Sequence, residues 1–275
     1  MTTLDSAADA TDRFPRRTHI MIRAINTAMR RIVVQPAGLV FAAVFYVMVT
    51  SILSGVWRVA AEVSGGDIVG YSAGALVWYI ATSEAATIAL PLRLIDDIGG
   101  DIGSGRFDTE MLRPASPLAL RMATEIGQML PRLAVCVSSG IALAWVVGGA
   151  PVSGVALALA APALLLAVTT NLFAQHAFAA GSFWVLDARG MWFLYTKLVF
   201  VLGGMLLPLE VLPDRAAEIA YYLPFAAMAY APARLASGHI EPELLVLQGF
   251  WLVVMGFAAR HAFAAGERHL IEAAA

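Results

Sequence analysis

Charge is scarce in this sequence of 275 residues, since charged side chains make up 14% of the chain and hydrophobic ones 60%. A soluble domain carries charge on about a quarter of its residues. The few charges fall almost entirely between apolar runs, as expected when a charge in hydrocarbon is strongly unfavourable. The composition therefore excludes an ordinary soluble domain and predicts an integral membrane protein.

Cysteine and lysine each occur once. Cys136 lies in an apolar run, which excludes an intrachain disulfide and a thiolate metal cluster. Lys197 lies in MWFLYTKLVF with no glycine-rich loop before it, so the chain has no Walker A motif for binding nucleotide phosphates. Residues 1–18 hold no apolar core before a cleavage site, and we interpret them as a cytosolic tail instead of a signal peptide.

Patterns of catalysis and cofactor binding are also missing. Gly100, Gly103 and Gly105 lie close together, but Asp108 stands where the third glycine of a dinucleotide fingerprint belongs. Ser104 lies between two of these glycines with no histidine in the same loop, and no H-E-x-x-H zinc pattern occurs. The sequence predicts no catalytic, cofactor-binding or metal-binding residue and favours a protein that is not an enzyme.

Apolar runs divide the chain into an expected all-α integral membrane fold. The first run covers 22 residues without a charge, and at a rise of 1.5 Å per residue it can cross a hydrocarbon core of roughly 30 Å. We expect one transmembrane domain over residues 19–275 with six transmembrane helices. The six spans are predicted at residues 36–57, 68–92, 130–147, 155–180, 191–209 and 244–259.

Two further segments are expected to lie at the membrane surface. Residues 19–34 place apolar side chains on one helical face and polar ones on the other, which suits an interfacial amphipathic helix or, alternatively, a short cytosolic helix packed on a partner. Residues 210–243 are apolar but interrupted by Pro213, Pro224 and Pro232, which forbid one continuous helix. We expect short re-entrant external helices there, with an ordinary apolar loop as the alternative.

Positive charges predict the orientation. With the N-terminus in the cytoplasm, fourteen Lys and Arg residues lie inside and three lie outside, namely Arg58, Arg215 and Arg234. Both termini are then cytoplasmic, as is the longest polar interruption, residues 93–121, which we call the charged loop. We expect its polar side chains to face a partner protein, against the alternative that they are only solvated. The candidate docking residues are Asp96, Asp97, Asp101 and Arg106.

Ionisable residues within spans predict a functional layer, because such residues are rarely kept in hydrocarbon without a role. The helical rise places Glu84 roughly 12 Å and Lys197 roughly 10 Å from the cytoplasmic ends of their spans. Asn171 and Gln175 share a helical face at similar depth. We predict an intramembrane polar layer of these four residues with a Glu84–Lys197 ion pair at its centre. The alternative is that both charged side chains extend to the interface.

Short motifs in a fixed order resemble the permease subunits of ABC type 2 exporters. Residues 95–98 (IDDI), 104–108 (SGRFD) and 112–117 (LRPASP) resemble the first intracellular loop of that family, which bears its coupling helix. Residues 203–213 (GGMLLPLEVLP) and 223–225 (LPF) resemble its fifth span and external helices. The closest similarity is to the bacterial viologen-exporter-like and multidrug subgroup. The external gate that the resemblance implies consists of Pro208, Pro213, Pro224 and Phe225.

The resemblance implies the biological setting. The chain would be a permease of the bacterial cytoplasmic membrane, pairing with a second copy or a related permease as a homodimer or heterodimer. A separate ATPase chain would bind ATP and magnesium, dock on the charged loop and drive export of an amphiphilic small molecule or lipid-like substrate. Two alternatives stay open: a proton-coupled secondary transporter that uses Glu84 as carrier, and a membrane assembly subunit without transport of its own.

Overall fold

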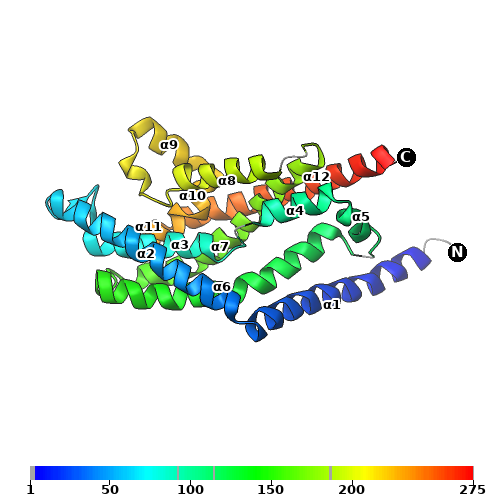
Figure 1. The fold of residues 1–275 in the computed structure, drawn as a ribbon, viewed down its shortest axis with the longest axis horizontal. Helices are drawn as coiled ribbons and strands as arrows, with labels where there is room; N and C mark the ends of the chain where they lie inside the picture. The colour runs from blue at the N-terminus through cyan, green and yellow to red at the C-terminus, as the bar shows by residue number, and fades with distance from the viewer. Residues whose placement is uncertain (1–3, 92, 114, 186–187, 275) are drawn as a thin grey trace.

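The computed structural model describes residues 4–91, 93–113, 115–185 and 188–274. This part of the chain is almost entirely helical and forms an elongated bundle (Figure 1). The all-α expectation is therefore confirmed, and the sheet found in the described residues is one small antiparallel hairpin. Its two strands are β1 (Asp67–Ile68) and β2 (Tyr71–Ser72).

Four described helices are long and apolar enough to cross a membrane. They coincide with four of the predicted spans, and two of these helices extend well beyond the predicted bounds. The helix at the third predicted span begins at residue 117 instead of 130, and the helix at the last one continues to residue 274 instead of ending at 259. These helices are α2 (Ala37–Val63), α6 (Pro117–Gly148), α7 (Gly154–Ala179, continued by the 3-10 turn η1, Ala180–Phe183) and α12 (Glu243–Ala274).

The other two predicted spans are shorter helices, α3 (Ala73–Ile88) and α8 (Ala188–Leu202). With 16 and 15 residues they are about 24 and 22 Å long at the helical rise. Helix α3 begins late because the hairpin precedes it, and the Ser72 side chain accepts a hydrogen bond from the Ala75 backbone as its N-cap. Helix α8 ends early because two glycines follow it, and Gly204 has a φ of +67°.

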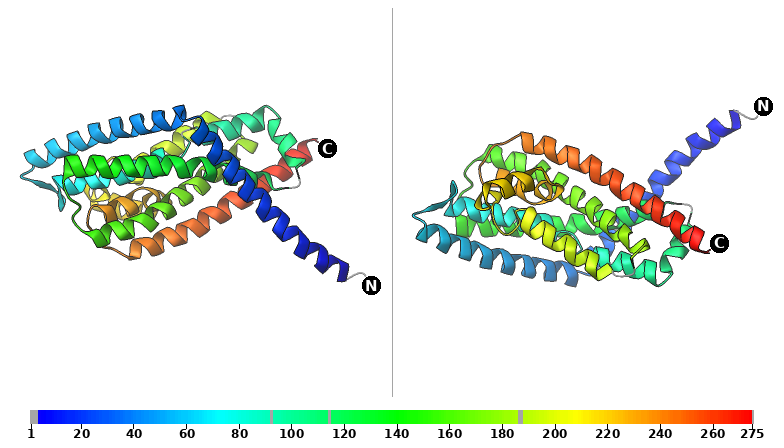
Figure 2. Two further views of the ribbon diagram at one scale, coloured as in Figure 1. Left: turned by 90° about the horizontal axis from the view of Figure 1, so that it is seen from below. Right: turned by 90° about the horizontal axis from the view of Figure 1, so that it is seen from above.

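Helix α1 (Leu4–Val34) includes the predicted interfacial helix and continues into the expected tail, where several alanines favour helix. It packs on α6 and leaves the bundle at an angle (Figure 2). Gly127 makes the crossing possible. A Cβ atom at that position would lie 2.3 Å from the Ile25 carbonyl oxygen, which is closer than any side chain allows. Backbone contact through a glycine is a common way for membrane helices to associate.

The charged loop folds into two short helices, α4 (Leu94–Gly103) and α5 (Arg106–Met111), before α6 begins. Arg121 holds them together. Its guanidinium donates to Asp101 at 2.7 Å and to Glu110 at 2.8 and 2.9 Å, and it lies 5.6 Å from the centre of the Phe107 ring. These helices lie at the same end of the bundle as the beginning of α1 and the end of α12 (Figure 1).

Residues 210–243 form a chain of short helices in the half of the bundle away from α5 (Figure 1). The prolines divide them as predicted: Pro213 precedes one helix, Pro224 is the first residue of the next and Pro232 lies in the third. The expectation of several short helices is thus confirmed. They are the turn η2 (Leu209–Val211) and the helices α9 (Asp214–Tyr222), α10 (Pro224–Met228) and α11 (Tyr230–Ala236).

Helix α2 turns its large apolar side chains away from the bundle and its small or polar ones inward. The inward face carries Tyr46, Thr50 and Ser54 at helical spacing, all fully buried. The outward face exposes large side chains such as Phe41 and Ile52. A soluble helix has the opposite pattern, so α2 is built for contact with lipid or with another apolar protein surface.

Candidate functional site

A cavity that we call the large cavity lies between α2, α3, α7 and α8 and has a volume of about 500 Å³. Apolar and aromatic side chains form most of its wall, including Phe45, Trp192 and Phe200. All four residues of the predicted polar layer line it, although they come from three helices. These residues are Glu84, Asn171, Gln175 and Lys197.

Hydrogen bonds fix one side of this polar layer. The Gln175 amide donates to Asn171 Oδ1 at 3.0 Å, as expected for residues four apart on a helix. The Tyr195 hydroxyl donates to the same oxygen at 2.5 Å and so joins α8 to α7. Tyr195 was not predicted as a member of this layer, because a tyrosine in an apolar span also fits ordinary packing. Its position two residues before Lys197 was the available signal.

The predicted Glu84–Lys197 ion pair is wrong. Glu84 is fully buried, and neither of its carboxyl oxygens has a hydrogen-bond partner. Lys197 is exposed, and its ammonium group lies 5.2 Å from the centre of the Phe193 ring and 5.9 Å from that of Phe200. These aromatic residues stand four before and three after the lysine on the same helix, so α8 itself stabilises the cation.

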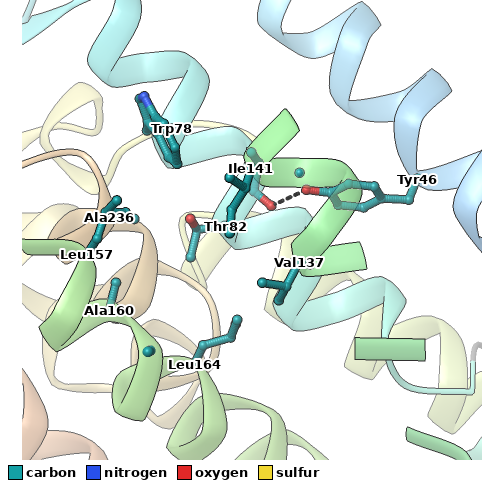
Figure 3. Close-up of a pocket in the computed structure, with 13 residues that line it drawn as sticks. Tyr46, Trp78, Thr82, Val137, Ile141, Leu157, Ala160, Leu164 and Ala236 are labelled. Atoms are coloured by element: carbon teal, nitrogen blue, oxygen red, sulfur yellow. Dashed lines mark hydrogen bonds between the residues drawn. The ribbon is translucent and has the colours of Figure 1, made fainter. Parts of the chain in front are cut away.

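A smaller cavity of about 140 Å³ lies between α2, α3, α6 and α7 (Figure 3). Its lining is nearly all apolar, with Thr82 directed towards the space and Val137 and Leu164 on its walls (Figure 3). The Tyr46 hydroxyl at its edge donates to the Ala81 carbonyl oxygen at 2.7 Å. This cavity contains no group that titrates near neutral pH, and we interpret it as a packing gap.

The four candidate docking residues differ in how far they are free to bind a partner. Asp101 forms ion pairs with Arg106 at 2.6 Å and Arg121 at 2.7 Å, so it already holds the charged loop together. Asp96 pairs with Arg93 at 2.6 Å. Asp97 is exposed and forms no ion pair with the described residues. Docking on these side chains stays a prediction, and Asp97 is the carboxylate best placed for it.

The candidate gate residues do not form one cluster in the described structure. Pro208, Pro224 and Phe225 are buried, whereas Pro213 is exposed before α9. Phe225 packs against Tyr195, with ring centres 6.4 Å apart, and Tyr195 lines the large cavity. A gating role for these four residues stays a prediction, which the contact between Phe225 and Tyr195 favours.

A polar cluster under the external helices was not predicted. Arg234 forms ion pairs with Glu210 at 3.0 Å and Glu241 at 2.9 Å, and it donates to the Tyr71 hydroxyl at 2.6 Å. Burial and the nearby Glu210 raise the pKa of Tyr71. Burial and the nearby Arg234 lower the pKa of His239, whose ring lies 4.6 Å from that of Tyr71. The cluster joins the hairpin to η2 and α11.

The sequence of the chain matches one family of known proteins over most of its length. A comparison with curated proteins gave no match. The profile of a family described as "ABC-2 family transporter protein" matches residues 45–272, which is most of the chain and includes every residue of the large cavity from Phe45 onwards. The match covers the charged loop and the external helices as well. This chain therefore belongs to the ABC-2 transporter family, whose members are multi-pass membrane proteins that serve as transport components.

Proposed function

We propose that this chain is the permease subunit of an ATP-driven exporter of the bacterial cytoplasmic membrane. A separate ATPase subunit docks on the charged loop, and the substrate is an amphiphilic small molecule or a lipid-like compound. Six membrane crossings place both termini in the cytoplasm, with α3 and α8 as the two short spans. Family membership supports an ABC ATPase partner in general, and the sequence has no Walker A motif of its own.

One observation carries this proposal: the charged loop packs on the same helices that carry the polar wall of the cavity. Helix α4 contacts α7, η1 and α8. The contact is close at Gly99, where a Cβ atom would lie 2.2 Å from the Ala188 Cβ and 2.8 Å from the Ser182 Oγ. A force on α4 would therefore reach α7 and α8 as a rigid-body movement and change the shape of the cavity.

The lining of the cavity supports the substrate class. An amphiphile can place its apolar part against Phe45, Trp192 and Phe200 and its polar part against Asn171 and Gln175. The resemblance to the viologen-exporter-like and multidrug subgroup agrees with this assignment. We propose that a second permease, either identical or related, packs against this side of the bundle, so that substrate passes along the interface between the two.

A second candidate function rests on Glu84. A fully buried carboxyl group without a hydrogen-bond partner inside a membrane cavity also suits a proton carrier. In that case the protein is a secondary transporter driven by a proton gradient and requires no ATPase partner. The two candidate functions differ in their source of energy, which is ATP for the exporter and a proton gradient for the secondary transporter.

The test uses inside-out membrane vesicles that contain this chain together with its proposed ATPase partner. Uptake of a fluorescent amphiphilic cation is measured with ATP and with a proton uncoupler. We expect ATP to drive uptake and the uncoupler to leave it largely unchanged. Uptake that the uncoupler abolishes and that persists without ATP would contradict the proposal in favour of proton coupling. Vesicles that contain the chain without the ATPase provide the control.

A further inference from the structure

A second polar groove, distinct from the cavity described above, lies where α1 turns into α2 and faces α6. It has a volume of about 610 Å³. Two arginines, two glutamines and two threonines line it, which makes it more polar than the other grooves of this surface. These residues are Thr27, Arg31, Gln35, Thr124, Gln128 and Arg132.

The two arginines supply positive charge to the groove. Neither Arg31 nor Arg132 forms an ion pair with any residue in the described part of the chain. Glu125 is near enough to interact electrostatically with Arg132 but lies outside ion-pair distance and does not line the groove. Two guanidinium groups and neutral hydrogen-bonding side chains are a donor set that suits a phosphate group.

The walls of the groove are held in place. Helix α1 crosses α6 at Gly127, whose backbone lies against that of Ile25, and Ala28 is buried at the same contact. The groove lies beside this crossing, between two helices that cannot separate without losing it. The site therefore exists before any ligand binds, which reduces the entropy cost of binding.

Depth and surroundings point to a membrane ligand. Arg132 precedes Gly148, the last residue of α6, by 16 positions, or about 24 Å along the helix, within a hydrocarbon core of roughly 30 Å. In the proposed orientation this is close to the inner headgroup region. Large apolar side chains within three positions of the groove residues Gln35 and Gly38 in the sequence are exposed, namely Val34, Val40 and Phe41. They offer an exposed apolar surface for acyl chains at the junction of α1 and α2.

We propose that this groove binds the headgroup of a phospholipid with net negative charge from the inner leaflet. Arg31 and Arg132 pair with the phosphate, Gln35 and Gln128 donate hydrogen bonds to the headgroup, and the acyl chains lie on the apolar residues beside the groove. The bound lipid then braces the junction of α1 and α2. The assignment of leaflet rests on the proposed orientation, whereas binding itself can be measured without ATP, partner or transport.

The test uses the full-length protein, purified in detergent and stripped of lipid. Short-chain phosphatidylglycerol is titrated, and bound lipid is counted by native mass spectrometry. We expect the R31Q/R132Q variant to bind it at least about tenfold more weakly than the wild type, because each arginine near an anionic headgroup contributes to binding. The matched control is R30Q, which removes an exposed arginine of the same helix that does not line the groove. It should bind like the wild type.

Further measurements compare an anionic lipid with a neutral lipid and with inorganic phosphate, and further variants control for misfolding. Phosphatidylcholine should bind more weakly than phosphatidylglycerol, and millimolar inorganic phosphate should not displace the lipid. The R31K/R132K variant keeps both charges and should keep most of the lipid binding. If the double variant R31Q/R132Q does not fold, the single variant R31Q, which changes an exposed residue, should still show weaker lipid binding than the wild type. Unchanged binding in R31Q/R132Q, equal binding of both lipids, or displacement by phosphate alone would each overturn the proposal.

Discussion

Replacing Glu84 with leucine is expected to raise the thermal stability of the protein while transport falls about tenfold or more. The Glu84 carboxyl group is fully buried, and neither of its oxygens has a hydrogen-bond partner. A buried polar group left in this state costs about 1–3 kcal/mol, which leucine of similar size removes. Transport falls because the same substitution takes the fully buried ionisable group out of the wall of the cavity.

The opposite signs make this prediction specific. A merely structural Glu84 would lose stability and transport together, whereas a functional one is retained at a cost in stability. Melting temperature in detergent and vesicle uptake are the two measurements. The control is T82V, which changes a residue of the smaller cavity and should leave transport unaltered. A lower melting temperature for E84L with transport at the wild-type level would contradict the assignment of the large cavity as the functional site.

Alanine at Gly99 is expected to uncouple ATP hydrolysis from transport, whereas alanine at the adjacent Gly100 should not. A Cβ atom at Gly99 would lie 2.2 Å from the Ala188 Cβ, but one at Gly100 would have no neighbour within 4 Å. Forced packing of this kind costs typically about 1–3 kcal/mol and displaces α4 from η1 and α8. In contrast, alanine at the exposed Gly100 favours the helix by up to about 1 kcal/mol.

The measurement is the amount of substrate transported per ATP hydrolysed, in proteoliposomes that contain the permease and its ATPase. We expect G99A to lower this ratio about tenfold, a change that corresponds to about 1.4 kcal/mol. The amount of each variant that inserts into the membrane provides the folding control. Equal ratios for G99A and G100A would show that the packing of α4 on the bundle does not transmit the signal.

The order of the helices could be predicted from the sequence because a long apolar run is itself the signal for a helix that crosses a membrane. Their ends could not always be predicted. The second expected span included residues 68–72, which form the hairpin instead, and the fifth included Gly203 and Gly204, which end α8. Hydropathy does not distinguish an apolar turn from an apolar helix, whereas two successive glycines were a signal available in the sequence.

The four predicted members of the polar layer line one cavity, but the predicted contact at its centre is wrong. Counting residues along a helix gives the depth of Glu84 and Lys197, but it does not give the direction in which each side chain points. Lys197 is accommodated by Phe193 and Phe200 on its own helix. These aromatic neighbours at helical spacing could have been noticed in the sequence.

The external cluster could not be predicted for a different reason. The Tyr71 hydroxyl contacts Glu210 and Arg234, which lie 139 and 163 positions further along the chain. No local periodicity links positions so far apart. The one hint is chemical, since an isolated charge such as Arg234 in an apolar segment requires a partner of opposite charge.

The ion pairs of the candidate docking residues could not be predicted from the sequence either. Asp101 forms ion pairs with Arg106 and Arg121, whereas Asp97 is exposed, and no local pattern distinguishes these two carboxylates.

The most direct test of the account is a single-site crosslink from the charged loop to the ATPase. The only cysteine, Cys136, is buried and can be replaced by alanine, so that D97C supplies the one reactive thiol. A thiol-directed crosslinker is applied to membranes, and the adduct is identified by mass spectrometry. We predict an adduct between position 97 and a chain that carries a Walker A motif, and none from R215C, an exposed position of the external helices. No adduct from position 97, or an equal one from position 215, would contradict docking of an ATPase on the charged loop.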